Sequence, residues 1–267
     1  MKIGGLYCEE RGATDGEPII LSAGLGGSGD YWTPNLAALC AEYRVILYDH
    51  RGTGRSDRVL PDPMTVETMA DDLITLMDGL AIENAHIMGH AAGGLAGLML
   101  ALRAPQRLRK LVVVNGWARA DPQFLRCFET RLALLRNSGP LAYIHAQPIF
   151  LYPAEWISEH SARLTSEEDG HLAAFPGAET MERRIAALSA FDIDARLGDI
   201  AVPTLAIAAM DDMLVPWTCS ARLAEGISGA TLMTMPWGAH SCNVTVPDIF
   251  NRNVLAWLSE GVQPGKA

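Results

Sequence analysis

The sequence has too few basic residues for a nucleic-acid-binding protein. Its 267 residues include 21 Lys and Arg against 31 Asp and Glu, a formal net charge of −10. Because binding to a phosphate backbone requires a basic surface, we expect no nucleic-acid partner. A small-molecule substrate is still compatible with this charge, since the local field in a pocket can oppose the net charge.

Long apolar runs and paired cysteines are also missing. No stretch of about 18 apolar residues occurs, so no transmembrane helix is expected, and Met1–Gly5 lacks the apolar run of a signal peptide. The five cysteines are scattered without a C-x-x-C pair. Neither a disulfide framework nor a zinc site is therefore indicated, and we expect a cytoplasmic protein without metal, cofactor or membrane contact.

What the chain does contain is an alternation of apolar strands and amphipathic helices. Continuous apolar runs predict buried strands at 18–22, 44–48, 84–88, 111–115, 202–208 and 231–235, and residues 1–12 predict an edge strand. Apolar residues at three- and four-residue steps predict a helix over 66–80, and further helices are predicted at 32–39, 95–102, 217–225 and 247–258. This pattern predicts an α/β fold whose mostly parallel sheet is flanked by helices on both faces.

The alternation of strands and helices stops between residues 117 and 200. This segment is predicted to be helical, is rich in aromatic residues and contains no convincing strand. We interpret this segment as a helical cap inserted after the strand that ends near Asn115. The core would then consist of residues 1–116 and 201–267. Residues after Glu260 are expected to be frayed.

The segment Gly89-His90-Ala91-Ala92-Gly93 reads as a sharp turn between a buried strand and a helix. Glycines at 89, 93 and 97 leave one face bare, so the two backbones can approach closely. This is the setting of the G-x-S-x-G nucleophile elbow of α/β-hydrolases. Here the central position is Ala91, and a methyl group cannot attack a carbonyl.

Two further residues follow strands in the order in which this fold supplies its acid and histidine. Asp212 follows the strand at 202–208, and His240 follows the strand at 231–235. A histidine can take up and return a proton, and a carboxylate fixes its tautomer. The backbone amides of Leu25 and Ala92 would stabilise a developing oxyanion.

Other assignments remain open at this point. Asp211 competes with Asp212 for the acid role, although the spacing to Pro216 favours Asp212. The serines that could act as surrogate nucleophiles, none of them on the elbow, are Ser22, Ser28 and Ser241. His90 is interpreted as a packed residue beside the elbow, and the loop at 49–57 as structural.

The whole chain resembles the α/β-hydrolase superfamily, and more narrowly the RutD family of bacterial pyrimidine (uracil) breakdown. The narrower resemblance rests on motifs in both core and cap: Gly24-Leu25-Gly26-Gly27-Ser28, Tyr48-Asp49-x-Arg51-Gly52-Thr53-Gly54, Gly89-His90-Ala91, Val114-Asn115-Gly116-Trp117, Arg126-Cys127-Phe128, Ala146-Gln147-Pro148, Phe150-Leu151-Tyr152-Pro153-Ala154-x-Trp156 and His240-x-Cys242-Asn243-Val244-Thr245. The resemblance implies a hydrolase of C–N bonds that acts on carbamate, or on aminoacrylate to give malonic semialdehyde and ammonia. It also implies that alanine at the elbow is native.

Ala91 lacks the hydroxyl group that the serine nucleophile of the fold would supply, which suggests that water is the nucleophile. His240, oriented by Asp212, would deprotonate the water, and no covalent intermediate would form. The residues considered for substrate binding are Gly24, Arg51, Trp117, Arg126 and Arg131, where an arginine would pair with a substrate carboxylate. Alternatives are an esterase or amidase inactivated by a Ser-to-Ala change, a non-catalytic small-molecule-binding protein, or non-hydrolytic general-base chemistry. The sequence leaves a homodimer open.

Overall fold

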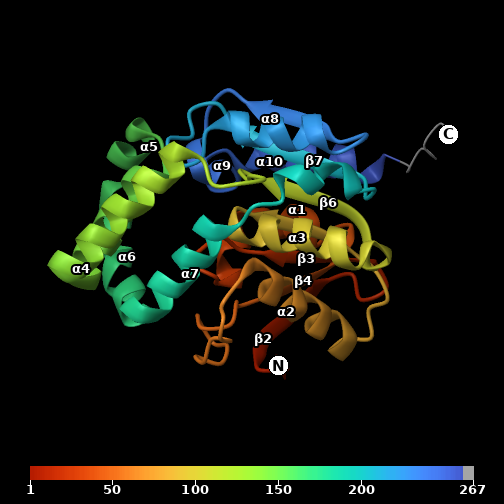
Figure 1. Ribbon diagram of the computed structural model, residues 1–267, viewed down its shortest axis with the longest axis horizontal. Coiled ribbons are helices and arrows are strands. Elements are labelled where there is room, and N and C mark those ends of the chain that lie inside the picture. Colours follow the sequence, from red (N-terminus) through yellow and green to blue (C-terminus); the bar gives the residue numbers. More distant parts are fainter. Residues whose placement is uncertain (261–267) are drawn as a thin grey trace.

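The protein, described from a computed structural model over residues 1–260, is built on an eight-stranded sheet (Figure 1). The residues that the sequence predicts to be frayed lie outside this described part. The spatial order of the strands is β1-β2-β4-β3-β5-β6-β7-β8. Only β1 and β2 run antiparallel to their neighbours, and all other pairs are parallel. The strands are β1 (Lys2–Ile3), β2 (Leu6–Gly12), β3 (Glu17–Ser22), β4 (Tyr43–Tyr48), β5 (Ala85–His90), β6 (Leu108–Val114), β7 (Thr204–Ala209) and β8 (Thr231–Met235).

The predicted fold class is therefore confirmed, with one difference at the amino terminus. The sequence predicts a single edge strand over residues 1–12, whereas the structure contains the two short strands β1 and β2. Gly4 and Gly5 between them have φ angles of 55° and 86°. Such angles suit glycine and reverse the chain, so β1 pairs with β2 as a hairpin.

Helices cover both faces of the sheet, which explains why the parallel strands are apolar throughout. One face packs against α2 (Val66–Gly79), α3 (Ala92–Arg103) and α8 (Trp217–Gly226), and the other against α1 (Thr33–Leu39) and α10 (Pro247–Ser259). The short remaining core elements are η1 (Gly29–Trp32), η2 (Pro105–Arg107), η3 (Asp194–Asp199), η4 (Ala239–Ser241) and α9 (Cys242–Thr245). No helix within residues 1–260 is both long and apolar enough to cross a membrane.

A helical insertion separates β6 from β7 and gathers at one end of the molecule (Figure 1). It consists of α4 (Pro122–Leu151), α5 (Ala154–Glu159), α6 (Ser161–Ala173) and α7 (Ala178–Ala190). The Asp121 side chain caps the first turn of α4 by accepting a hydrogen bond from the Gln123 amide. The helix is kinked at Gly139, whose φ of 83° and ψ of −179° are not helical. Gly139 therefore divides α4 into two helical segments.

The turn between β5 and α3 brings strand and helix backbones into close contact. Ala91 adopts φ 43° and ψ −111°, an angle pair that is rare for a residue with a side chain. Its amide donates to the carbonyl of Val114 at 2.8 Å. A Cβ on Gly93 would lie 2.3 Å from the carbonyl oxygen of Ser22, so only glycine fits there.

We expect Gly93→Ala to destabilise the protein by about 1–3 kcal/mol, because the added methyl group would overlap the backbone of β3. A matched control is Gly170→Ala, which also lies in a helix but meets no atom within 4 Å. The free energy of unfolding of the Gly170→Ala control should increase by about 0.5–1 kcal/mol, because alanine loses less conformational entropy than glycine in a helix. Urea unfolding measures both changes, and equal stability of the two variants would contradict this account of the turn.

Candidate active site

Asp212 and His240 form a buried pair at the carboxyl edge of the sheet. His240 Nδ1 lies 2.7 Å from Asp212 Oδ2, and the residues are 3% and 7% exposed. The other carboxylate oxygen of Asp212 accepts the amides of Leu214 at 2.8 Å and Val215 at 2.9 Å. Because a carboxylate only accepts, Nδ1 carries the proton and Nε2 is the basic nitrogen of the neutral ring.

Asp211 has a different environment from its neighbour. Its two oxygens accept the amides of Gly238 at 3.2 Å and Ala239 at 2.9 Å. Asp211 therefore holds the loop that carries His240 but does not contact the imidazole. Of the two acids between which the sequence left a choice, the structure brings Asp212 to the histidine.

The backbone of His240 is fixed by two residues at the ends of neighbouring strands. Asn115 Nδ2 donates to the His240 carbonyl at 2.6 Å, and Asn115 Oδ1 accepts the Ala209 amide at 3.2 Å. His90 Nε2 donates to the same carbonyl at 2.7 Å. Sequence reasoning missed the role of Asn115, although an asparagine directly after an apolar strand is a signal for the positive φ of 50° found here.

The two amides proposed as oxyanion donors are free of protein acceptors in the described part of the chain. Ala92 is the first residue of α3, so its N–H has no acceptor within the helix. Leu25 lies in the loop after β3, and its N–H makes no hydrogen bond to residues 1–260. Ala91, His240 and Leu25 line the same cavity.

Arg184, which sequence reasoning did not identify, ties the cap to the loop that carries Leu25. This buried side chain of α7 donates to the Leu25 carbonyl from Nε at 3.3 Å and Nη2 at 3.1 Å. It also donates to the Arg51 carbonyl at 3.2 Å and to His50 Nδ1 at 2.9 Å. Burial lowers the pKa of Arg184 to about 10. No signal in the sequence links residues so far apart.

The cavity above Ala91 has a volume of about 970 Å³ and lies between the sheet edge and the helical insertion. Of the five residues considered for substrate binding, Gly24, Trp117 and Arg131 line this cavity. Arg51 and Arg126 do not. Arg51 pairs with Asp72 at 2.7 Å, and Arg126 is exposed on α4. Of the three arginines considered, Arg131 is therefore the one that lines this cavity.

Comparison with known proteins shows which family this chain belongs to. The family model for the alpha/beta hydrolase fold matches residues 17–141. A protein of Caulobacter sp. (strain K31), named "Putative carbamate hydrolase RutD", is 57% identical over 96% of this chain and 97% of its own length. A protein of the same name from Variovorax paradoxus (strain S110) is 51% identical over 97% and 98%. The chain belongs to the RutD family.

A solved relative shows the same architecture. The enol-lactonase from Burkholderia xenovorans LB400 is 28% identical, covers 97% of this chain and 98% of its own, and superposes with a TM-score of 0.87. This chain therefore has the α/β-hydrolase fold, including the sheet and the helical insertion α4–α7.

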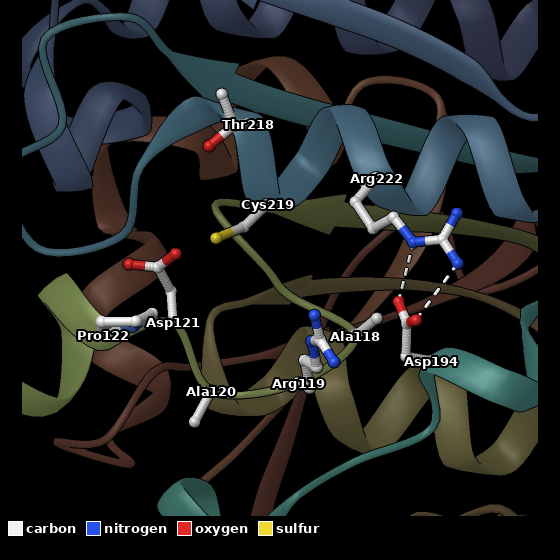
Figure 2. Close-up of a pocket in the computed structure, with 9 residues that line it drawn as sticks. All are labelled: Ala118, Arg119, Ala120, Asp121, Pro122, Asp194, Thr218, Cys219 and Arg222. Carbon is white, nitrogen blue, oxygen red and sulfur yellow. Dashed lines mark hydrogen bonds and ion pairs between the residues drawn. The ribbon is translucent and has the colours of Figure 1, made fainter.

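A second, smaller cavity of about 190 Å³ lies away from His240, where the segment leading into α4 meets α8 and η3. Figure 2 shows that the side chains of Arg222 and Asp194, which line this cavity, face each other. Arg222 Nε donates to Asp194 Oδ1 at 2.7 Å, and Arg222 Nη2 donates to Asp194 Oδ2 at 3.1 Å. Burial raises the pKa of the Cys219 thiol to about 12, so this thiol is not poised as a nucleophile. Among residues 1–260, no group of three or more His, Cys, Asp or Glu side chains is arranged to hold a metal.

We expect the protein to lose stability as the pH falls below about 6.5. Burial holds the pKa of His50 and His90 well below that of an exposed histidine. The unfolded chain therefore binds more protons than the folded chain below this pH, which favours unfolding. Thermal melts should show Tm decreasing toward acid, with a shallower decrease in His90→Gln than in the exposed-site control His145→Gln. A constant or rising Tm would contradict this prediction.

Proposed function

We propose that this RutD-family protein hydrolyses the C–N bond of a small carbamate-type substrate with a water molecule activated by His240. The observation that carries the proposal is the 2.7 Å bond between His240 Nδ1 and Asp212, beside an elbow that presents only the methyl group of Ala91. The bond leaves Nε2 free to act as a base. The name of the relatives, carbamate hydrolase, supports this substrate class.

The reaction converts carbamate and water to ammonia and bicarbonate. His240 Nε2 takes a proton from the water as its oxygen attacks the carbamate carbon, and the imidazolium faces the Asp212 carboxylate. The same proton then passes to the leaving nitrogen as the C–N bond breaks, so the ring returns to its neutral state. Because Ala91 has no hydroxyl group, no acyl-enzyme forms.

The amides of Leu25 and Ala92 would stabilise the negative charge that develops on the substrate oxygen. Each such donor contributes roughly 3 kcal/mol to lowering a barrier of this kind. The hydrogen bonds from Arg184 to the Leu25 carbonyl hold this residue in place. Arg184 thus acts as a positioning residue for the donor loop.

The same groups would serve for aminoacrylate, whose imine form is attacked by water to give malonic semialdehyde and ammonia. The sequence resemblance supports this second substrate and a place for the protein in uracil breakdown. Both substrates also hydrolyse without a catalyst, so general-base assistance of about 10²–10⁴-fold is sufficient for function.

We expect His240→Ala to reduce the protein-dependent rate of ammonia release by about 10²–10⁴-fold, because the general base is lost. The assay compares release from carbamate and from aminoacrylate with a blank that contains no protein. His145→Ala, an exposed substitution on α4, is the matched control and should retain full activity. A His240→Ala rate equal to that of the unaltered protein would rule out this mechanism.

A further inference from the structure

The cavity above Ala91 gathers buried polar atoms that have no partner in the protein. Six buried side-chain nitrogen and oxygen atoms lack a hydrogen bond within residues 1–260, and four of them belong to residues that line this cavity. The four are Trp117 Nε1, Arg131 Nε, His90 Nδ1 and Ser241 Oγ. Because buried polar groups are nearly always hydrogen-bonded, this concentration points to a polar ligand.

Arg131 is the charged member of this group, and its charge is not balanced. The residue is 4% exposed, and its hydrogen bond within the described chain goes to Tyr143 Oη at 2.8 Å. The rings of Phe128 and Tyr143 lie 4.9 Å from its Cζ, and that of Phe150 lies 5.5 Å away. No acidic side chain of residues 1–260 forms an ion pair with it. A buried cation without a counter-ion is costly, so an anion is the expected ligand.

The chemistry of Arg131 favours a carboxylate over a phosphate group as the anionic ligand. The planar Arg131 guanidinium can itself bind one planar carboxylate group through two parallel N–H···O bonds. Phosphate sites commonly add several backbone amides at a helix N-terminus, whereas Arg131 lies inside α4.

The size and walls of the cavity indicate a ligand with an apolar body. Pockets that hold drug-sized ligands measure roughly 300–1,000 Å³, and this cavity of about 970 Å³ is at the upper end. Carbamate is only about as large as an aspartate side chain. The apolar lining includes Phe124, Phe128, Ile144, Leu151, Met181 and Leu188.

We propose that the substrate is an organic carboxylate larger than carbamate, whose carboxylate binds Arg131 and whose apolar body packs on the cap. This inference rests on the proposed function for the position of the scissile C–N bond, next to Ala91 and His240. It favours a substrate built like aminoacrylate, whose carboxylate is separate from the carbon that water attacks, over carbamate itself. Arg131 belongs to α4 of the insertion, whereas Ala91 belongs to the sheet edge. The carboxylate and the reacting carbon are therefore separate groups of the substrate.

Binding of simple probes tests this proposal without turnover. Calorimetric titration of the full chain with hexanoate, hexanamide and acetate separates the contributions of charge and apolar length. Hexanoate should bind at least about tenfold more tightly than hexanamide, which lacks the charge, and than acetate, which lacks the chain. Equal affinity for hexanoate and hexanamide would overturn the carboxylate site, and equal affinity for hexanoate and acetate would overturn the apolar body.

Substitutions test whether Arg131 causes the preference for hexanoate over hexanamide. Arg131→Gln should abolish the preference for hexanoate over hexanamide, whereas Arg126→Gln, an exposed site on the same helix, should retain it. If Arg131→Gln does not fold, as judged by circular dichroism, Tyr143→Phe replaces it. This change removes the hydroxyl group that accepts a hydrogen bond from Arg131 and should weaken hexanoate binding several-fold. A retained preference in Arg131→Gln, or unchanged hexanoate affinity in Tyr143→Phe, would contradict the proposal. Since affinity is measured, the result is independent of whether His240→Ala retains activity.

Discussion

The conformation of Ala91 is the constraint on which the rest of the site depends. A residue with a side chain in this region of φ and ψ costs on the order of 1–3 kcal/mol and persists only where its surroundings hold it. Here the Ala91 amide bonds to Val114 of β6, and its carbonyl accepts the Leu95 amide of α3 at 3.0 Å. Gly93 lies against the backbone of Ser22 in β3. Three strands and a helix thus fix the turn that presents Ala91 to the cavity and places Ala92 at the first position of α3.

The groups around this turn are positioned mainly by hydrogen bonds that involve backbone atoms. Asp211 accepts two amides of the loop before His240, and Asn115 connects the His240 carbonyl to the end of β7. Arg184 connects the cap to the Leu25 carbonyl. Such contacts leave few side chains to be rearranged when charge develops, which is the condition for effective electrostatic stabilisation of a transition state.

The fold could be predicted from the sequence because each strand is a continuous apolar run and each helix has a periodic apolar face. The pairing of Asp212 with His240 followed from their positions after strands of one parallel sheet, whose carboxyl ends meet at one edge. The choice among Arg51, Arg126 and Arg131 could not be made from sequence, because it depends on which side of α4 faces the sheet and on the partner Asp72. The contacts of Arg184 with Leu25 join segments far apart in the chain and leave no local pattern.

The central claim is that His240 Nε2 accepts a hydrogen bond from a water molecule. This water would occupy the position that a serine hydroxyl group takes in other members of the fold. A crystal structure at a resolution that reveals ordered water tests it most directly. The account predicts a water within about 3 Å of Nε2 that also faces the amides of Leu25 or Ala92. An Nε2 atom bonded to a protein side chain, or a space beside Ala91 filled by apolar groups, would contradict it.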